Sequence, residues 1–227
     1  MNASVSRRDF LKTGSAALAF ACAAPGCVAP PKPTAAAPGA RQIRKGIMWG
    51  TVGVKGSIAG KMKAIKEAGF DGVEMMSHMN AAEVLKARDA AGLEIPSVCG
   101  ELHWKKPLTD PDPQVRAEGL EGLKQCLRAA KSYGASSVLL VPGVVNKDVS
   151  YADAYQRAQA EIRKAIPLAE KLGVKIAIEN VWNNFLLSPL EAARFVDEFH
   201  SPAVGWHFDV GNVLNYGWPE QLSLIHI

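Results

Sequence analysis

Short apolar runs alternate with longer segments of helical period along residues 43–221 of the chain. The runs are rich in Val, Ile, Leu and Met with few regular polar interruptions, a pattern typical of strands that are covered on both faces. They predict six strands, at residues 43–50, 72–76, 95–100, 137–141, 174–180 and 204–210. Five helices are predicted between them, at residues 57–68, 81–91, 113–133, 151–172 and 189–199.

Helix boundaries are marked by glycine and proline. Four predicted helices run into a glycine that suits a left-handed C-terminal cap, and a strand follows each: Gly69, Gly92, Gly134 and Gly173. Asp112-Pro113 and Ser188-Pro189 each place a capping side chain before a proline in the first helical turn. Pro167 lies inside the fourth helix and is predicted to kink or split it.

Regular alternation of strands and helices predicts an α/β fold with a parallel sheet. Each unit takes roughly 30 residues, and an eight-unit barrel takes roughly 250. The fold class is therefore a (β/α)8 TIM barrel with about six of its eight βα units present. A doubly wound open sheet is the competing architecture, but Gly50-Thr51-Val52-Gly53 does not form the Gly-rich fingerprint that a dinucleotide fold carries after its first strand.

The first 27 residues have the order of an export signal. The pair Arg7-Arg8 precedes a mild apolar stretch at residues 14–24 that ends in small residues, which points to the twin-arginine pathway. The stretch is too short to span a bilayer, which takes about 20 residues. A basic N-terminal tail is the alternative. We expect a protein exported from the cytoplasm.

Two cleavage sites compete in this leader. Ala21-Cys22-Ala23 suits a peptidase that requires small residues, whereas Ala24-Pro25-Gly26-Cys27 resembles a weak lipoprotein box. Lipid on Cys27 would make the Pro/Ala-rich linker at residues 28–42 a membrane tether, so the protein is either periplasmic or a membrane-anchored lipoprotein. Cys99 lies on a predicted strand and Cys126 on a predicted helix, and both are expected to be buried thiols, with a disulfide between them as the alternative. No Cys-x-x-Cys metal pattern is present.

Positive charge is concentrated in the leader. Residues 1–43 carry five basic side chains against Asp9, so 5 − 1 = +4, which equals the formal charge of the whole chain. The remaining domain is neutral, which argues against nucleic acid as a partner. Contact with a membrane is expected only through the signal or a lipid on Cys27, and a homo-oligomer is left open.

The last six residues, 222–227, break the pattern. Leu222-Ser223-Leu224-Ile225-His226-Ile227 resembles the translation of an adapter used in DNA library preparation, so we expect an artefactual tail on a barrel of residues 43–221. A genuine helix start is the alternative. A barrel that lacks two units exposes the edges of its first and sixth strands, and we therefore expect this fragment to be unstable and inactive.

Two acidic residues end neighbouring strands, Glu179 in Lys175-Ile176-Ala177-Ile178-Glu179-Asn180 and Asp209 on the strand that follows. Carboxyl ends of barrel strands point into the active site. Buried carboxylates are costly unless they are paired or bind a metal. Their oxygens suit Mg²⁺ or Mn²⁺, and a histidine shifts the preference toward Mn²⁺, Co²⁺ or Zn²⁺. The alternative is a pair of helix-capping acids.

The motifs Ile178-Glu179-Asn180 and His207-Phe208-Asp209-Val210-Gly211-Asn212 resemble those of the xylose-isomerase-like TIM-barrel superfamily. The nearest group is the sugar phosphate isomerase/epimerase family, which includes hydroxypyruvate isomerase and D-tagatose 3-epimerase. The resemblance implies one divalent metal held by Glu, Asp, His and Glu on the fifth to eighth strands. Glu179 and Asp209 match the first two ligands, and the other two would lie beyond Gln221. Mn²⁺, Mg²⁺ or Co²⁺ is implied first, with Zn²⁺ as an alternative.

The resemblance also implies the reaction, a sugar or hydroxy-keto acid isomerase/epimerase that moves a proton through an enediolate. Glu179 would be a catalytic acid/base as well as a metal ligand. Asn212 stands where many relatives carry a histidine that touches substrate, which leaves the substrate open. Competing interpretations are a metal-dependent lyase or hydratase acting on keto-sugars, and a carbohydrate-binding barrel without catalysis. The superfamily also includes endonuclease IV, a zinc enzyme that acts on abasic DNA. The neutral charge of the domain argues against that function for this chain.

Further substrate contacts are predicted around the strand ends. Glu74 on the second strand, His103 after the third, Trp49 on the first and Asn180 beside the ligand strand complete the expected substrate-binding set with Asn212. Strand-end capping, a surface loop and barrel packing are the respective alternatives for Glu74, His103 and Trp49. His207 is expected to point inward below Asp209 without binding metal.

Overall fold

The computed structural model describes residues 43–219. The predicted export signal at 1–27 with its Cys27 lipid site, the linker at 28–42 and the tail at 222–227 lie outside the described residues. The barrel predicted for residues 43–221 is described except for its last two residues.

The strands form one parallel sheet in sequential order, β1-β2-β3-β4-β5-β6. Their bounds are β1 (Gly46–Met48), β2 (Gly72–Met76), β3 (Ser97–Cys99), β4 (Ser137–Leu140), β5 (Lys175–Glu179) and β6 (Val204–His207). A doubly wound sheet reverses its strand order, and this sheet does not. The fold is that of a partial TIM barrel, with β1 and β6 as the edges of the sheet within residues 43–219.

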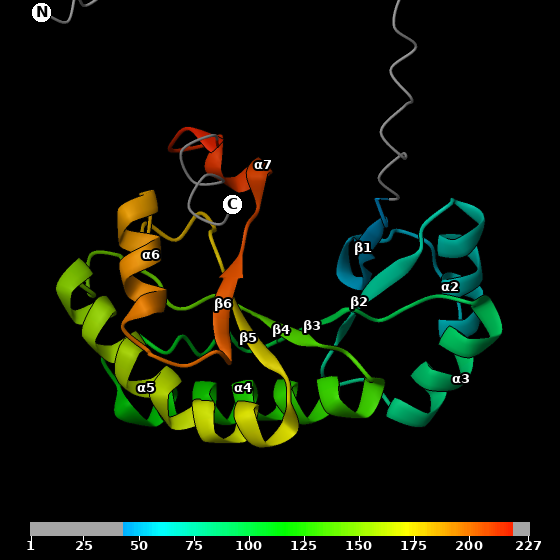
Figure 1. Ribbon diagram of the computed structural model, residues 1–227, viewed down its shortest axis with the longest axis horizontal. Coiled ribbons are helices and arrows are strands. Elements are labelled where there is room, and N and C mark those ends of the chain that lie inside the picture. Colours follow the sequence, from blue (N-terminus) through cyan, green and yellow to red (C-terminus); the bar gives the residue numbers. More distant parts are fainter. Residues whose placement is uncertain (1–42, 220–227) are drawn as a thin grey trace, which may run out of the picture. The chain divides into compact units, whose positions relative to one another are not determined.

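Helices cover the outer side of the curved sheet (Figure 1). Each main helix connects two neighbouring strands, and two short helical turns follow β1 and β6. The bounds are η1 (Trp49–Thr51), α2 (Ile58–Glu67), α3 (Ala81–Ala91), α4 (Pro113–Tyr133), α5 (Tyr151–Leu172), α6 (Pro189–Asp197) and α7 (Val210–Val213). Within residues 43–219, no helix combines the length and apolar character needed to cross a membrane.

Three of the four predicted glycine caps are confirmed, whereas α2 is capped by Ala68 and Gly69 follows with a φ of 85°. Gly92, Gly134 and Gly173 adopt φ values of 62°, 77° and 66° at the ends of α3, α4 and α5. This left-handed region is nearly free of strain only for glycine. Ser188 forms a full capping box with Glu191 at the start of α6.

Three local predictions need correction. The first strand is shorter than expected, because Trp49 starts a 3-10 turn and does not end β1. Pro167 does not split α5, which runs unbroken because its buried apolar side chains outweigh one missing hydrogen bond. The sixth strand stops at His207, because Asp209 caps the short helix α7.

Alternate residues of each strand face opposite sides of the sheet. Val98, Val138 and Ile178 pack toward the helices in the main core. Cys99, Leu139 and Val141 form a smaller apolar cluster that excludes these residues and also takes in Met48 and Met76. Because Ile178 points to the helices, its neighbour Glu179 points to the inner side of the sheet.

Candidate active site

A cavity of about 530 Å³ on the inner side of the sheet brings three predicted acids together, Glu74, Glu179 and Asp209. They come from β2, the end of β5 and the turn after β6. His207 also lines this cavity, in the inward position predicted for it. The remaining lining residues are Gly46, Ile47, Met48, Thr51, Pro96, Ser97 and Leu139.

Glu179 is half-buried at the last position of β5. Burial, followed by the negative charges of Asp209 and Glu74, raises the pKa of its carboxyl to about 7. None of the ion pairs formed by residues 43–219 includes Glu179. The carboxyl therefore lies among like charges, an arrangement that costs free energy unless a cation or a proton enters the cavity.

Asp209 caps α7, so the helix-capping alternative holds for one of its oxygens. Its Oδ1 accepts a hydrogen bond from the Asn212 backbone N–H at 2.8 Å. In the described part of the chain its Oδ2 has no hydrogen-bond partner. One oxygen is thus held by the helix, and the other retains its capacity to bind a metal or a substrate hydroxyl.

Asn180 is used differently from its predicted role as a substrate contact. It is 1% exposed, and its amide makes two hydrogen bonds with the main chain of Asp209. Its Nδ2 donates to the Asp209 carbonyl at 2.7 Å, and its Oδ1 accepts from the Asp209 N–H at 2.8 Å. The amide of Asn212, also predicted to touch substrate, donates to the Asn180 carbonyl at 3.0 Å. The Asn180 amide thus contacts Asp209, and the Asn212 amide contacts Asn180.

Glu74 lies in the middle of β2 and does not end it. Ser97 Oγ donates to Glu74 Oε1 at 2.5 Å, a contact that sequence reasoning missed. The only signal for it is a polar residue at the start of the next strand, which does not reveal its partner. The Cys99 thiol lies nearby, and burial followed by the charge of Glu74 raises its pKa. Cys99 and Cys126 are buried free thiols, as predicted.

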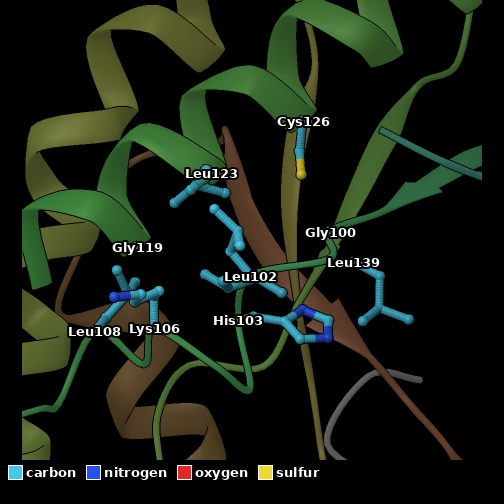
Figure 2. Close-up of a pocket in the computed structure, with 11 residues that line it drawn as sticks. Gly100, Leu102, His103, Lys106, Leu108, Gly119, Leu123, Cys126 and Leu139 are labelled. Carbon is cyan, nitrogen blue, oxygen red and sulfur yellow. The ribbon is translucent and has the colours of Figure 1, made fainter. Parts of the chain in front are cut away.

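His103 occupies a separate, nearly closed pocket of about 10 Å³, and Figure 2 shows its ring between Leu102 and Leu139. Burial lowers the pKa of the imidazole to about 4, so the ring is neutral near pH 7. Its buried Nδ1 has no hydrogen-bond partner among residues 43–219. His103 does not line the acidic cavity. The loop after β3 turns the ring inward, where it packs against leucine side chains that shield it from water.

Trp49 also lies outside the cavity lining. Its ring packs partly buried against the main core, with Lys61 Nζ 4.2 Å from the ring centroid. The barrel-packing alternative therefore describes Trp49 better than a substrate wall does. The early end of β1 is the physical reason, because the 3-10 turn redirects the side chain.

Glu179 and Asp209 offer two of the ligands that a metal site would need. One hard carboxylate at the end of β5 and one in the turn after β6 offer oxygen ligands. Burial and the charges of Asp209 and Glu74 raise the pKa of Glu179, and a divalent ion would offset those charges. Residues 43–219 contain no group of three or more His, Cys, Asp or Glu side chains arranged to hold a metal. Glu179 and Asp209 therefore fit part of a metal ligand set. Glu74 does not join them as a third ligand.

The sheet order, the helical cover and the acidic cavity define a class of protein. The sequence profile of the xylose isomerase-like TIM barrel family matches residues 62–226, and the chain belongs to that family. The resemblance drawn from the two motifs at Glu179 and Asp209 is thereby confirmed at the level of the family.

Sequence relatives are sugar epimerases. L-ribulose-5-phosphate 3-epimerase UlaE of Escherichia coli K12 is 23% identical over 177 residues, which cover 72% of this chain and 62% of the relative. The UlaE protein of Salmonella typhi is 24% identical over 181 residues, with the same coverage. The chain thus spans less than two thirds of the length of these relatives.

Solved structures share the fold at low identity. A D-tagatose 3-epimerase-like protein aligns with a TM-score of 0.71 at 20% identity, covering 81% of this chain and 71% of its own. The 3-keto-D-glucoside 4-epimerase YcjR of E. coli aligns at 0.64 and 19%, covering 72% and 68%. A D-psicose 3-epimerase solved in the presence of D-fructose aligns at 0.64 and 20%, covering 76% and 65%. The likeness of these structures to this chain is one of fold.

Proposed function

We propose that the complete gene product is a divalent-metal-dependent isomerase or epimerase of a sugar or hydroxy-keto acid. The observation that carries the proposal is the placement of Glu179 and Asp209 in one cavity without a basic partner within residues 43–219. Distant relatives that epimerise sugars support the same class of reaction.

A divalent ion, when bound, would polarise a substrate carbonyl and the adjoining hydroxyl, which favours an enediolate. In this chain Glu179 and the Oδ2 atom of Asp209 would hold it. Two ligands from further βα units outside residues 43–219 would complete the set. Mn²⁺, Mg²⁺ or Co²⁺ suits such oxygen-rich ligands, and Zn²⁺ is the alternative.

Glu179 also suits proton transfer. In the metal-free chain, burial and the negative charges of Asp209 and Glu74 raise the pKa of its carboxyl. A carboxylate placed beside the reacting carbon would accept a proton and return it, which is the role of a general acid/base. Glu74 is held by Ser97 and lines the same cavity, where it would accept a hydrogen bond from a substrate hydroxyl. The apolar floor at Leu139 and Met48 would exclude water from the exchanging proton.

Proton exchange in heavy water tests the proposal. The complete gene product with Mn²⁺ is incubated with a panel of ketoses and keto-glucosides, and deuterium at carbon is followed by NMR. We expect exchange in the wild type and a loss of at least about 10³-fold in Glu179→Gln. Glu121→Gln, which changes an exposed glutamate of α4, is the matched control and should retain activity. A metal-loaded protein that exchanges no proton on any of these sugars contradicts the proposal.

A second function shares the same site. The likeness to a 3-keto-D-glucoside epimerase favours oxidised sugars as substrates, and a lyase or hydratase acting on them would use the same acid and metal. Loss or gain of water, seen as an 18-dalton change by mass spectrometry, separates it from epimerisation, which conserves mass. Sugar binding without exchange or mass change would favour the non-catalytic barrel.

We also propose that the 227-residue chain is inactive by itself, because residues 43–219 hold no group of three or more His, Cys, Asp or Glu side chains arranged to bind a metal. Assaying it beside the complete gene product tests this, and equal exchange rates would contradict it.

Export by the twin-arginine pathway is proposed from Arg7-Arg8. Replacing both with lysine should abolish periplasmic accumulation, and Cys27→Ser should release the protein from the membrane fraction if Cys27 is lipidated. Unchanged fractionation of the lysine variant contradicts the export proposal.

A further inference from the structure

We infer that Asn180 and Asn212 are positioning residues that fix the Asp209 carboxylate beside Glu179. The inference rests on the proposed metal site and goes beyond it, because it assigns roles to two residues that bind neither metal nor substrate themselves. It reinterprets two side chains that the sequence placed among substrate contacts.

Asp209 lies where the sheet no longer holds the chain. The last paired position of β5 and β6 joins Glu179 to His207, two residues before Asp209. Without further support, the main chain at Asp209 would be a connection between strand and helix with freedom to move. A ligand on such a connection binds a metal weakly, because ordering it on binding costs conformational entropy.

The Asn180 side chain supplies the hydrogen bonds that a neighbouring strand would otherwise make with Asp209. It accepts from the N–H of Asp209 and donates to its carbonyl, at 2.8 and 2.7 Å, as the main chain of a neighbouring strand would. A primary amide is the one short side chain that both donates and accepts in this way. The side chain is 1% exposed, so water does not compete for either bond.

The main chain of Asn212 holds the carboxylate itself. Its backbone N–H donates to Asp209 Oδ1 at 2.8 Å, which restricts rotation of the carboxyl group and is independent of the side chain at 212. Its amide returns to the Asn180 carbonyl at 3.0 Å and closes a ring of three residues. The indole N–H of Trp182 donates to the Asn212 carbonyl at 3.1 Å from outside this ring. The carboxylate is therefore oriented from the main chain, from its own side chain and from the next turn of the chain.

Substitution at residue 180 separates geometry from charge. Asn180→Asp keeps the size and the acceptor but loses the donor, and it adds a negative charge near Asp209. If charge alone controlled metal affinity, this variant would bind Mn²⁺ more tightly than wild type. If position controls it, the variant binds more weakly, as Asn180→Ala does.

Asn183 provides a matched control. It is also 1% exposed in the loop after β5, but its amide donates to the Gly143 carbonyl at 2.7 Å and does not contact Asp209. Asn183→Ala should lower thermal stability about as much as Asn180→Ala does, since each removes a buried amide. It should leave metal affinity unchanged.

The experiment measures Mn²⁺ affinity by electron paramagnetic resonance and by calorimetry on the complete gene product, together with kcat and KM for proton exchange. We expect Asn180→Ala and Asn180→Asp to weaken Mn²⁺ binding by about 10- to 100-fold, and Asn212→Ala by about 10-fold. Saturating Mn²⁺ should restore most of kcat with KM for the sugar little changed.

Equal affinities of Asn180→Ala and Asn183→Ala would overturn the inference, as would tighter binding by Asn180→Asp. Wild type that binds Mn²⁺ without proton exchange refutes the proposed function alone, and the affinities of the variants still decide the positioning role. Wild type that binds no Mn²⁺ overturns both.

Discussion

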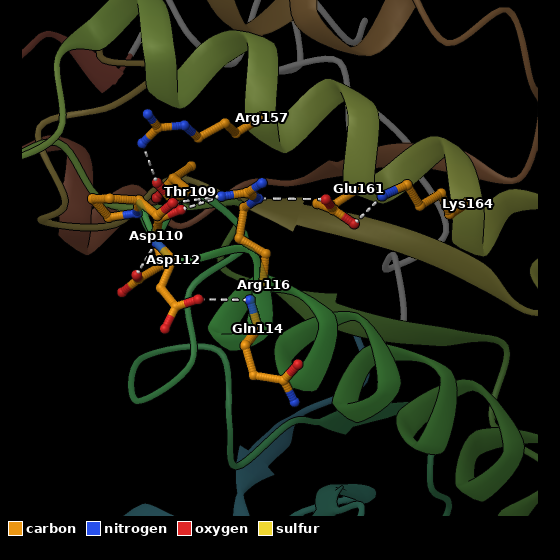
Figure 3. Close-up of polar contacts among 9 residues, drawn as sticks. Thr109, Asp110, Asp112, Gln114, Arg116, Arg157, Glu161 and Lys164 are labelled. Carbon is orange, nitrogen blue, oxygen red and sulfur yellow. Dashed lines mark hydrogen bonds and ion pairs between the residues drawn. The ribbon is translucent and has the colours of Figure 1, made fainter.

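Glu161 and Glu179 are two acids that are partly or fully shielded from water, but the charges beside them have opposite signs. Glu161 in α5 is 6% exposed and pairs with Arg116 at 3.5 Å and Lys164 at 2.7 Å (Figure 3). Glu179 is half-buried and has Asp209 and Glu74 as its charged neighbours. The first carboxylate is neutralised by two cations, whereas the second is repelled by two anions.

The pairing of Glu161 belongs to the scaffold. Arg116 of α4 also donates to the carbonyls of Asp110 and Pro111, so one guanidinium joins the start of α4 to α5. Arg157 of α5 donates to the Thr109 carbonyl in the same network (Figure 3). These contacts hold two helices on the outer side of the sheet. Burial of an acid therefore does not mark a functional site, and the sign of the neighbouring charges does.

The comparison predicts that removing the paired acid destabilises the fold most. Glu161→Ala leaves Arg116 shielded without its carboxylate, which should lower the free energy of unfolding by about 3 kcal/mol. Urea denaturation of the complete gene product measures it. The double variant Glu161→Met with Arg116→Met removes both charges and should recover part of the loss. A loss below about 0.5 kcal/mol for Glu161→Ala would contradict the scaffold role.

His103 extends the comparison to a half-buried ring whose Nδ1 has no hydrogen-bond partner within residues 43–219. Burial lowers its pKa from 6.5 to about 4, so the unfolded chain binds a proton before the folded chain does. The free energy of unfolding that depends on the neutral ring is fully present above pH 6.5 and is lost as pH falls toward 4, by about 3 kcal/mol. The free energy of unfolding measured across this range should fall less in His103→Phe, which does not titrate. Parallel pH profiles would show that the imidazole is solvated.

Neutralising Glu179 should raise the free energy of unfolding, whereas loss of Glu161 should lower it. In metal-free buffer at pH 8, Glu179→Gln removes a charge that Asp209 and Glu74 disfavour, and it should raise the free energy of unfolding by about 1 kcal/mol. Adding Mn²⁺ should reverse the order, because only wild type retains the carboxylate ligand. Thermal melts with EDTA and with Mn²⁺ check this. A destabilised Glu179→Gln in EDTA would show an unrecognised partner of Glu179.

The smallest effect is expected at an exposed pair. Arg128 and Glu121 of α4 lie 2.7 Å apart with side chains 55% and 60% exposed. Arg128→Ala should change the free energy of unfolding by less than about 0.5 kcal/mol, since solvent screens such a pair. The same urea series measures it beside Glu161→Ala. A loss comparable to that of Glu161→Ala would remove the distinction between shielded and exposed pairs.

The sequence by itself determined the features that depend on neighbours along the chain. Helix caps at Gly92, Gly134 and Gly173 follow from local backbone conformation. The period of the apolar residues predicts alternating strands and helices, and the parallel sheet follows from it. Glu179 and Asp209 were found because one ends β5 and the other follows the end of β6 by two residues, and the carboxyl ends of parallel strands meet at one edge.

The tertiary structure alone decided what each polar side chain touches. Asn180 and Asp209 are 29 residues apart, Ser97 and Glu74 are 23 apart, and Thr109 reaches Val144 across 35. No local pattern encodes such pairs, because a hydrogen bond depends on atomic distance and not on residue type alone. For the same reason the sequence assigned His103 and Trp49 to the substrate, whereas packing places one in a separate apolar pocket and the other against the core. Residue types and periods are properties of the chain, but charge neighbours and hydrogen-bond partners are properties of the fold.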